Sequence, residues 1–191
     1  VLNGAVDIGY GNLISTIQAN SQGLPIVSIA SSDASAVSAE LDTNWIMVRS
    51  DSGIQTVDDL AGTPVAVNAL NGLVHLFTAE TIDELGGDSS SVQFTEIPFP
   101  DMLAALEGNR VDAISTTEPF RTIGVQNPDN VAIAPVTTIG GTRLGLTFDT
   151  YFTSEDFLKN NEEAVKRFRE AIYEAQQLAI GQLNDQAMAT A

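Results

Sequence analysis

Segments of strand length alternate with segments of helical spacing along residues 6–125, and this alternation constrains the fold more than any other feature of the chain. Residues 26–30 (IVSIA) and 64–68 (PVAVN) are predicted strands. Residues 13–21 and the segment from Gly72 to about Leu85 are predicted helices. Strands that alternate with helices favour βαβ units, in which parallel strands carry helices on both faces. We therefore expect an α/β fold.

Residues 97–120 (IPFPDMLAALEGNRVDAISTTEPF) contain one complete unit of this kind. Asp101 is the predicted helix N-cap, Gly108 is the glycine after the helix, and residues 111–115 form the next strand. Residues 2–8 match residues 106–114, with one extra residue before the Val-Asp pair in the longer copy. We interpret this match as a weak internal repeat and as a sign of two related lobes.

The ends of the predicted strands supply the candidate binding residues. In open parallel sheets, ligands bind outside the carboxyl ends of the strands, where the chain turns into helices. This rule selects the loops at residues 10–12, 68–72, 98–101 and 116–118. Residues 44–45 are added because an indole can stack on a flat ligand. The predicted ligand-binding residues are Tyr10, Gly11, Asn12, Asn44, Trp45, Asn68, Asn71, Asp101, Thr117 and Glu118.

Each candidate also has an ordinary structural interpretation. Asn12 and Asn71 stand where helices begin, so each can contact a polar ligand there or simply cap the helix. Glu118 can accept a hydrogen bond from an amine, amidine or hydroxyl of a ligand, or it can be a solvated turn residue. Trp45 can stack on a ligand or belong to the core. The sequence leaves these alternatives open.

Charge and composition exclude several functions. The formal net charge of −17 disfavours nucleic acid and anionic membrane surfaces as partners. The chain has no cysteine and one histidine, which excludes thiol catalysis, disulfides and a multi-histidine metal site. His75 has no recognisable nucleophile or orienting partner, so we predict no catalytic residue. Arg121 and Arg143 can pair with an anionic ligand or form surface salt bridges.

The order of five segments resembles a known family. The segments are VDIGYGN (6–12), GLPIVSIAS (23–31), DSGIQTVDDLAGTPVAVNALNG (51–72), VQFTEIPFPDMLAALEGNRVDAISTTEPF (92–120) and SEDFLKNNEEAVKRFREAI (154–172). Together they resemble the substrate-binding proteins of ABC importers, in the nitrate/sulfonate/taurine group that also includes thiamine-pyrimidine binding proteins. The resemblance covers nearly the whole chain.

This resemblance implies an extracytoplasmic receptor, either periplasmic or held at the outer face of the cell membrane by a lipid anchor. Such a receptor captures a small sulfonate, amine or pyrimidine-type ligand and delivers it to a membrane permease. Its cleft loops would be those selected above, and Glu118 makes a purely anionic ligand such as nitrate less attractive. The resemblance implies no catalytic residue, metal or cofactor.

The resemblance also implies a type II periplasmic-binding-protein fold, in which two α/β lobes close on the ligand around a hinge. Lobe 1 would comprise residues 1–43 and 135–191, and lobe 2 residues 44–134, with crossing strands near residues 44–49 and 131–136. Family members begin with a strand, a helix and a further strand before the point where this chain starts. We therefore expect an incomplete first lobe, whose open sheet edge a second copy can fill to give a dimer.

Two other function classes stay open. The first is an enzyme on the same fold, from pyrimidine or menaquinone biosynthesis. The related pyrimidine synthase uses iron and a cysteine-rich motif that this chain lacks, and no residues match the menaquinone dehydratase. The second is the effector domain of a transcriptional regulator, which would bring a helix-turn-helix segment that these residues do not show.

Overall fold

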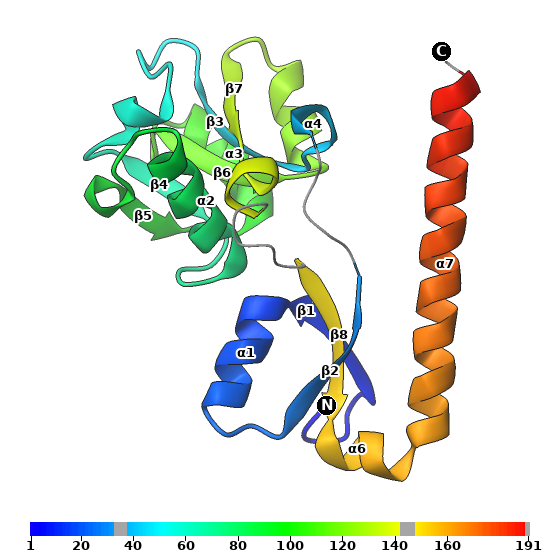
Figure 1. The fold of residues 1–191 in the computed structure, drawn as a ribbon. Helices are drawn as coiled ribbons and strands as arrows, with labels where there is room; N and C mark the ends of the chain where they lie inside the picture. The colour runs from blue at the N-terminus through cyan, green and yellow to red at the C-terminus, as the bar shows by residue number, and fades with distance from the viewer. Residues whose placement is uncertain (33–37, 142–147, 190–191) are drawn as a thin grey trace. The chain divides into compact units, whose positions relative to one another are not determined.

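The computed structural model describes residues 1–32, 38–141 and 148–189, and the chain divides into two compact units. Unit 1 contains residues 1–34 and 147–191, and unit 2 contains residues 35–146. Figure 1 shows a separate β-sheet in each unit. The predicted lobe boundaries at residues 43/44 and 134/135 stay a prediction. Within the described residues, no helix is long and apolar enough to cross a membrane.

Unit 2 is built on a five-stranded sheet with the order β5-β4-β6-β3-β7. Its strands are β3 (Asn44–Arg49), β4 (Pro64–Val67), β5 (Gln93–Glu96), β6 (Ala113–Thr117) and β7 (Asn130–Pro135). Strand β4 pairs in parallel with β5 and β6, as the alternation predicts. Strand β3 is antiparallel to both of its neighbours, so the expectation of parallel strands is wrong for β3. Between β3 and β4 the chain forms only the short 3₁₀ helix η2 (Val57–Leu60), whereas parallel crossovers usually contain an α-helix.

Helices cover both faces of this sheet. Helix α2 (Leu73–Glu84) packs on one face, where Thr78 hydrogen-bonds Ser115 of β6 at 2.7 Å. Helices α3 (Phe99–Glu107) and α4 (Phe120–Gln126) lie on the other face. There Met102 and Leu106 of α3 are fully buried in one cluster with Ile114 of β6. Since neighbouring residues of a strand point to opposite faces, Ile114 and Ser115 mark the two sides of the sheet.

Shorter segments complete unit 2. A 3₁₀ helix, η1 (Ala39–Leu41), precedes β3, and another, η3 (Ser89–Ser91), precedes β5. The π-helical turn η4 (Thr137–Gly141) follows β7 and packs on α2. A Cβ atom at Gly140 would collide with the carbonyl oxygen of Phe77, so this close approach requires glycine.

The helix in residues 97–120 begins earlier than predicted. Its N-cap is Pro98, and Asp101 lies in the first turn of α3 and is exposed, so the prediction of Asp101 as the N-cap is wrong. Pro100 caused the error, because a proline there looks like a helix breaker. At a helix start the missing N–H of proline costs nothing, since the first N–H groups have no intrahelical acceptor. Gly108 is the C-cap, one residue after the end of the helix.

Unit 1 contains a three-stranded antiparallel sheet with the order β1-β8-β2. Its strands are β1 (Ile8–Asn12), β2 (Ile26–Ser31) and β8 (Asp149–Ser154). Its helices are α1 (Leu13–Ser21), α6 (Glu155–Asn160) and α7 (Glu162–Ala189). The edge of Phe168 on α7 contacts the ring of Tyr151, which fixes the helix against the sheet.

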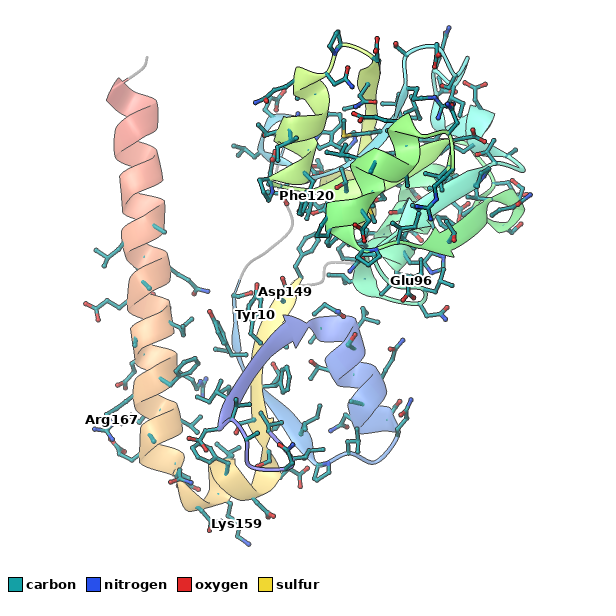
Figure 2. All side chains as sticks on the ribbon, turned by 180° about the vertical axis from the view of Figure 1, so that it is seen from behind. Tyr10, Glu96, Phe120, Asp149, Lys159 and Arg167 are labelled. Atoms are coloured by element: carbon teal, nitrogen blue, oxygen red, sulfur yellow. The ribbon has the colours of Figure 1, made fainter. Side chains whose placement is uncertain are left out.

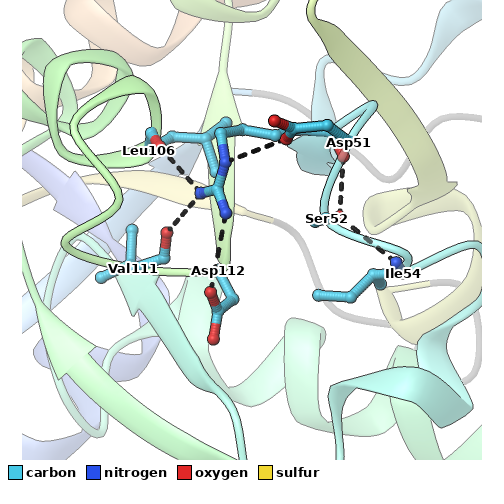
Figure 3. A network of polar contacts seen from close by, with 7 residues as sticks. Asp51, Ser52, Ile54, Leu106, Val111 and Asp112 are labelled. Atoms are coloured by element: carbon cyan, nitrogen blue, oxygen red, sulfur yellow. Dashed lines mark hydrogen bonds and ion pairs between the residues drawn. The ribbon is translucent and has the colours of Figure 1, made fainter.

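Arg49, the last residue of β3, ties three segments of unit 2 together (Figure 3). Its Nη1 donates to the carbonyl oxygens of Leu106 and Val111, at 3.0 and 3.2 Å. Its guanidinium also forms ion pairs with Asp51 at 3.4 Å and Asp112 at 3.9 Å. The side chain is only 15% exposed, so these partners replace most of its water. The network joins the end of β3 to the end of α3 and the start of β6.

We predict that Arg49→Met lowers the free energy of unfolding by about 2–3 kcal/mol, because two carbonyls lose a charged donor. Urea denaturation followed by circular dichroism measures this change. Arg110→Met is the matched control: Arg110 is exposed, so its substitution should stay within about 0.5 kcal/mol of wild type. Equal effects of the two substitutions would contradict a role for the network in stability.

Candidate functional site

The carboxyl ends of the parallel strands define one edge of unit 2, called here the carboxyl edge. Strands β4, β5 and β6 end at this edge, and the antiparallel strand β3 begins there, with Asn44 opposite Thr117 and Trp45 opposite Thr116. Figure 2 shows Glu96 and Phe120 along this edge of unit 2. The carboxyl edge thus gathers Asn44, Trp45, Asn68, Asn71, Asp101, Thr117 and Glu118, which are seven of the predicted binding residues.

Two of these residues, Trp45 and Asn68, share one face of the sheet with Thr116, which was not among the predicted binding residues. Trp45 packs on the core cluster beneath α3, and its strand partner Thr116 therefore points to the same face. The parallel register pairs Ala66 with Ile114, and its continuation places Asn68 beside Thr116. The end of the α3-covered face thus carries an indole, a hydroxyl and an amide next to one another.

Buried polar atoms at the carboxyl edge lack partners. Six buried side-chain polar atoms of the described residues have no hydrogen bond, and three belong to Asn68 (Oδ1), Thr116 (Oγ1) and Arg121 (Nε). Thr116 is fully buried. A buried polar atom without a partner costs roughly 1–3 kcal/mol, so such atoms are usually paired. Two others of the six, Arg49 Nε and Asn130 Oδ1, lie at the opposite edge.

Arg121 stacks on Trp45 and pairs with Glu118. The centre of its guanidinium lies 5.0 Å from the centroid of the indole, in cation–π geometry. Its Nη1 lies 3.5 Å from Oε1 of Glu118. The Trp45 indole donates its own N–H to the carbonyl of Asp42 at 3.0 Å. The guanidinium is therefore oriented by two neighbours while its Nε has no acceptor.

Glu118 follows β6 directly and is held by the start of α4. Its Oε2 accepts the backbone N–H of Thr122 at 3.1 Å. Partial burial acts to raise the pKa of Glu118, but the hydrogen bonds from Thr122 and the ion pair with Arg121 outweigh it, so the pKa lies below its ordinary value. Glu118 is therefore ionised at neutral pH and balances the charge of Arg121. The rings of Phe99 and Phe120 stack on each other, with centroids 6.3 Å apart.

The loop between β4 and α2 is fixed by two side chains that the sequence did not suggest. Glu96 accepts the N–H of Leu70 at 3.0 Å, and Nδ1 of His75 accepts the N–H of Asn71 at 2.8 Å. Asn71 has φ 59°, a left-handed conformation that asparagine tolerates. The N-cap of α2 is Gly72, so the side chain of Asn71 is not the helix cap. Because Nδ1 of His75 accepts a hydrogen bond, the ring is neutral with its proton on Nε2.

The other predicted residues of unit 2 have mixed environments. Asn44 is 6% exposed, and its Oδ1 accepts a hydrogen bond from the hydroxyl of Thr43. Thr117 is half-buried at the end of β6, and Asp101 is exposed. Arg143 lies outside the described residues. In the described part of the chain, no three His, Asp or Glu side chains cluster closely enough to hold a metal ion.

Tyr10, Gly11 and Asn12 lie in unit 1. The hydroxyl of Tyr10 donates to Asp149 at 3.0 Å, and Figure 2 shows the two residues at the same end of the sheet. Asn12 is the N-cap of α1, and its Oδ1 accepts the N–H of Ser15 at 2.8 Å. The capping role proposed for Asn12 is therefore confirmed. The three residues also line a pocket of about 550 Å³ beside α1.

Residues 1–184 match the protein-family model described as NMT1/THI5 like. A comparison with curated proteins found no match. Among solved structures, the chain is similar to the periplasmic aliphatic sulphonate binding protein SsuA from Escherichia coli, with TM-score 0.72, 22% identity, and coverage of 98% of this chain and 57% of that chain.

Two further structures are similar. The alkanesulfonate-binding protein SsuA from Xanthomonas axonopodis pv. citri, bound to MOPS, gives TM-score 0.76 and 18% identity over 99% of this chain and 63% of that one. The substrate binding protein of an amino acid ABC transporter gives TM-score 0.61 and 16% identity over 93% of this chain and 68% of that one. The chain thus spans less than two thirds of the two sulfonate-binding structures. These similarities confirm the predicted α/β periplasmic-binding-protein fold.

We predict that His75 makes stability depend on pH because its ring is partly buried. Burial lowers the pKa of His75 below its ordinary value of 6.5, so the folded protein favours the neutral ring. The neutral His75 ring therefore makes its full contribution to the free energy of unfolding above pH 6.5. As the pH falls below 6.5, the unfolded chain takes up a proton that the folded chain resists, and the free energy of unfolding decreases.

Urea unfolding of wild type and His75→Gln between pH 8 and pH 5 measures this effect. The difference in the free energy of unfolding between wild type and His75→Gln should decrease as the pH falls. The decrease should be less than about 1 kcal/mol because the ring is only half-buried. Parallel pH curves for the two proteins would contradict a neutral, hydrogen-bonded His75.

Proposed function

We propose a function from one premise: the chain belongs to the NMT1/THI5-like family. The function is that of a non-catalytic receptor, which binds a small polar molecule at the carboxyl edge of unit 2 and passes it to the permease of an ABC importer. Solved structures with this fold include sulfonate-binding proteins and a substrate-binding protein of an amino acid ABC transporter. They support the receptor role. The chemical class of the ligand is argued below from the residues of this chain.

The observation that carries the proposal is the group of unpartnered atoms on Asn68, Thr116 and Arg121. A ligand that fits all three has an acceptor for the guanidinium, a hydrogen-bonding atom for the hydroxyl and a donor for the amide oxygen. The Trp45 indole adds apolar surface next to the guanidinium. Few polar groups among apolar walls are typical of small-molecule sites.

These requirements favour a small molecule that combines acceptors with a donor. A sulfonate group supplies acceptors for Arg121 and Thr116, and an amine or a pyrimidine N–H supplies a donor for Asn68. Glu118 is ionised and adjacent, so it also favours a ligand that carries a donor or positive charge. A small, purely anionic ligand such as nitrate leaves Asn68 without a donor. We therefore propose a small sulfonate, amine or pyrimidine-type ligand.

The proposal extends to partners and location. An ABC importer receptor works outside the cytoplasm, as a periplasmic or lipid-anchored protein, and contacts a membrane permease. Tyr10, Gly11 and Asn12 of unit 1 stay predicted ligand-binding residues. Within the described residues, β1 is an outer strand of a three-stranded sheet, which supports a dimer formed by strand pairing with a second copy.

We predict that Thr116→Val weakens ligand binding about tenfold and leaves the unfolding free energy of the ligand-free protein unchanged or slightly higher. Valine keeps the shape of the side chain and removes a hydroxyl that has no partner. A thermal-shift screen with methanesulfonate, MOPS, taurine, thiamine and single amino acids identifies a ligand, and titration calorimetry then measures affinity.

Thr78→Val is the matched control. Thr78 is also fully buried, but its hydroxyl is bonded to Val74 and Ser115 on the α2-covered face. Its loss should therefore lower stability and leave affinity within about twofold. The site proposal is wrong if Thr116→Val leaves affinity unchanged. The receptor proposal is wrong if a compound of the screen is converted into product.

A further inference from the structure

The carboxylate of Asp42 is buried without a cation. Asp42 is 2% exposed, and among the described residues no basic side chain lies within 4.0 Å of it. A buried carboxylate is costly unless hydrogen bonds replace its water. Here both oxygens accept backbone N–H groups: Oδ1 from Asn44 at 2.9 Å and Oδ2 from Thr138 at 2.6 Å. These are charge-assisted bonds, which are about twice as strong as neutral ones.

The two bonds join segments that are far apart in the sequence. Asn44 begins β3, and Thr138 belongs to η4, which follows β7. Two further bonds support the junction: the Thr138 hydroxyl donates to the carbonyl of Ser38 at 3.1 Å, and the N–H of Val136 donates to the carbonyl of Asn44 at 2.9 Å. One carboxylate therefore fixes the start of β3 against the end of β7.

This junction leads directly to the candidate site. The backbone carbonyl of Asp42 accepts the indole N–H of Trp45 at 3.0 Å. The indole in turn lies beneath the guanidinium of Arg121. The N–H of Glu118 also donates to the carbonyl of Thr43, the residue between Asp42 and Asn44, at 3.1 Å. Trp45, Arg121 and Glu118 of the carboxyl edge are thus positioned by the backbone of residues 42–43, which the carboxylate of Asp42 fixes.

We infer that Asp42 is a positioning residue for ligand binding. It touches no ligand itself, and it fixes the Trp45 indole and, through the indole, the guanidinium of Arg121. The inference rests on the proposed function of the carboxyl edge for its effect on affinity. Its structural part, the control of Trp45 by Asp42, is independent of any ligand.

The test uses Asp42→Asn and the intrinsic fluorescence of Trp45, which is the single tryptophan of the chain. The amide has nearly the same shape, but one of its two polar atoms is a donor that would face a backbone N–H. The displaced start of β3 should expose the indole and raise its acrylamide quenching constant about twofold in the ligand-free protein. Affinity for methanesulfonate, or for the compound found by the screen, should fall about tenfold.

Asp83→Asn is the matched control, because Asp83 also accepts a backbone N–H, from Ser89 at 2.8 Å, but has no bond to the carboxyl edge. Its quenching constant and affinity should equal those of wild type. Unchanged quenching in Asp42→Asn overturns the inference, whether or not a ligand is found. If the quenching constant changes in Asp42→Asn but the screen finds no ligand, Asp42 still positions Trp45. That result counts against the proposed function alone.

A second measurement covers the case in which Asp42→Asn does not fold. In wild type, one carboxylate accepts the amides of both Asn44 and Thr138. Native-state hydrogen exchange should therefore give these amides protection factors within about twofold of each other, because they open together. Protection factors that differ by more than about tenfold would overturn the inference.

Discussion

The pairing of β3 between β6 and β7 is the interaction on which the rest of unit 2 depends. Ile46, Met47 and Val48 in the middle of the strand are at most 1% exposed, so the strand is fixed by burial as well as by its hydrogen bonds. The two ends of β3 make different contacts. Arg49 at the last position ties β3 to the neighbouring segments, and Trp45 near the first position supports Arg121 at the carboxyl edge.

Both ends contain buried polar atoms without a hydrogen bond: those of Asn68, Thr116 and Arg121 at the carboxyl edge, and Arg49 Nε and Asn130 Oδ1 at the opposite edge. At the opposite edge, the Nη1 of Arg49 also satisfies two backbone carbonyls. Unpaired atoms cost stability, and proteins tend to accept such local costs at functional sites. The ion pair of Glu118 with Arg121 and the junction at Asp42 keep the groups at the carboxyl edge in place.

Local patterns predicted most elements but few of their contacts. The helix predicted at residues 13–21 and the strand predicted at residues 26–30 follow from local spacing, and the structure contains both, as α1 and β2. The strand-end rule selected Asn68 and Glu118, which the carboxyl edge contains. Thr116 lies in the selected loop 116–118 but was not named among the predicted binding residues, and the structure places it inside β6. Asp42 gave no signal either, since its acceptor role depends on Thr138, 96 residues away. Such pairings arise from the register of the sheet, which the sequence of one strand does not specify.

The central claim is that a small ligand binds at the carboxyl edge of unit 2. A titration of the ¹⁵N-labelled protein, followed by NMR, tests it most directly, because the single tryptophan gives one indole N–H signal. We expect the indole of Trp45, the Nε–H of Arg121 and the amide of Asn68 to shift with one common dissociation constant. Shifts confined to the opposite edge, around Arg49 and Asp129, or to unit 1 alone, would contradict the account.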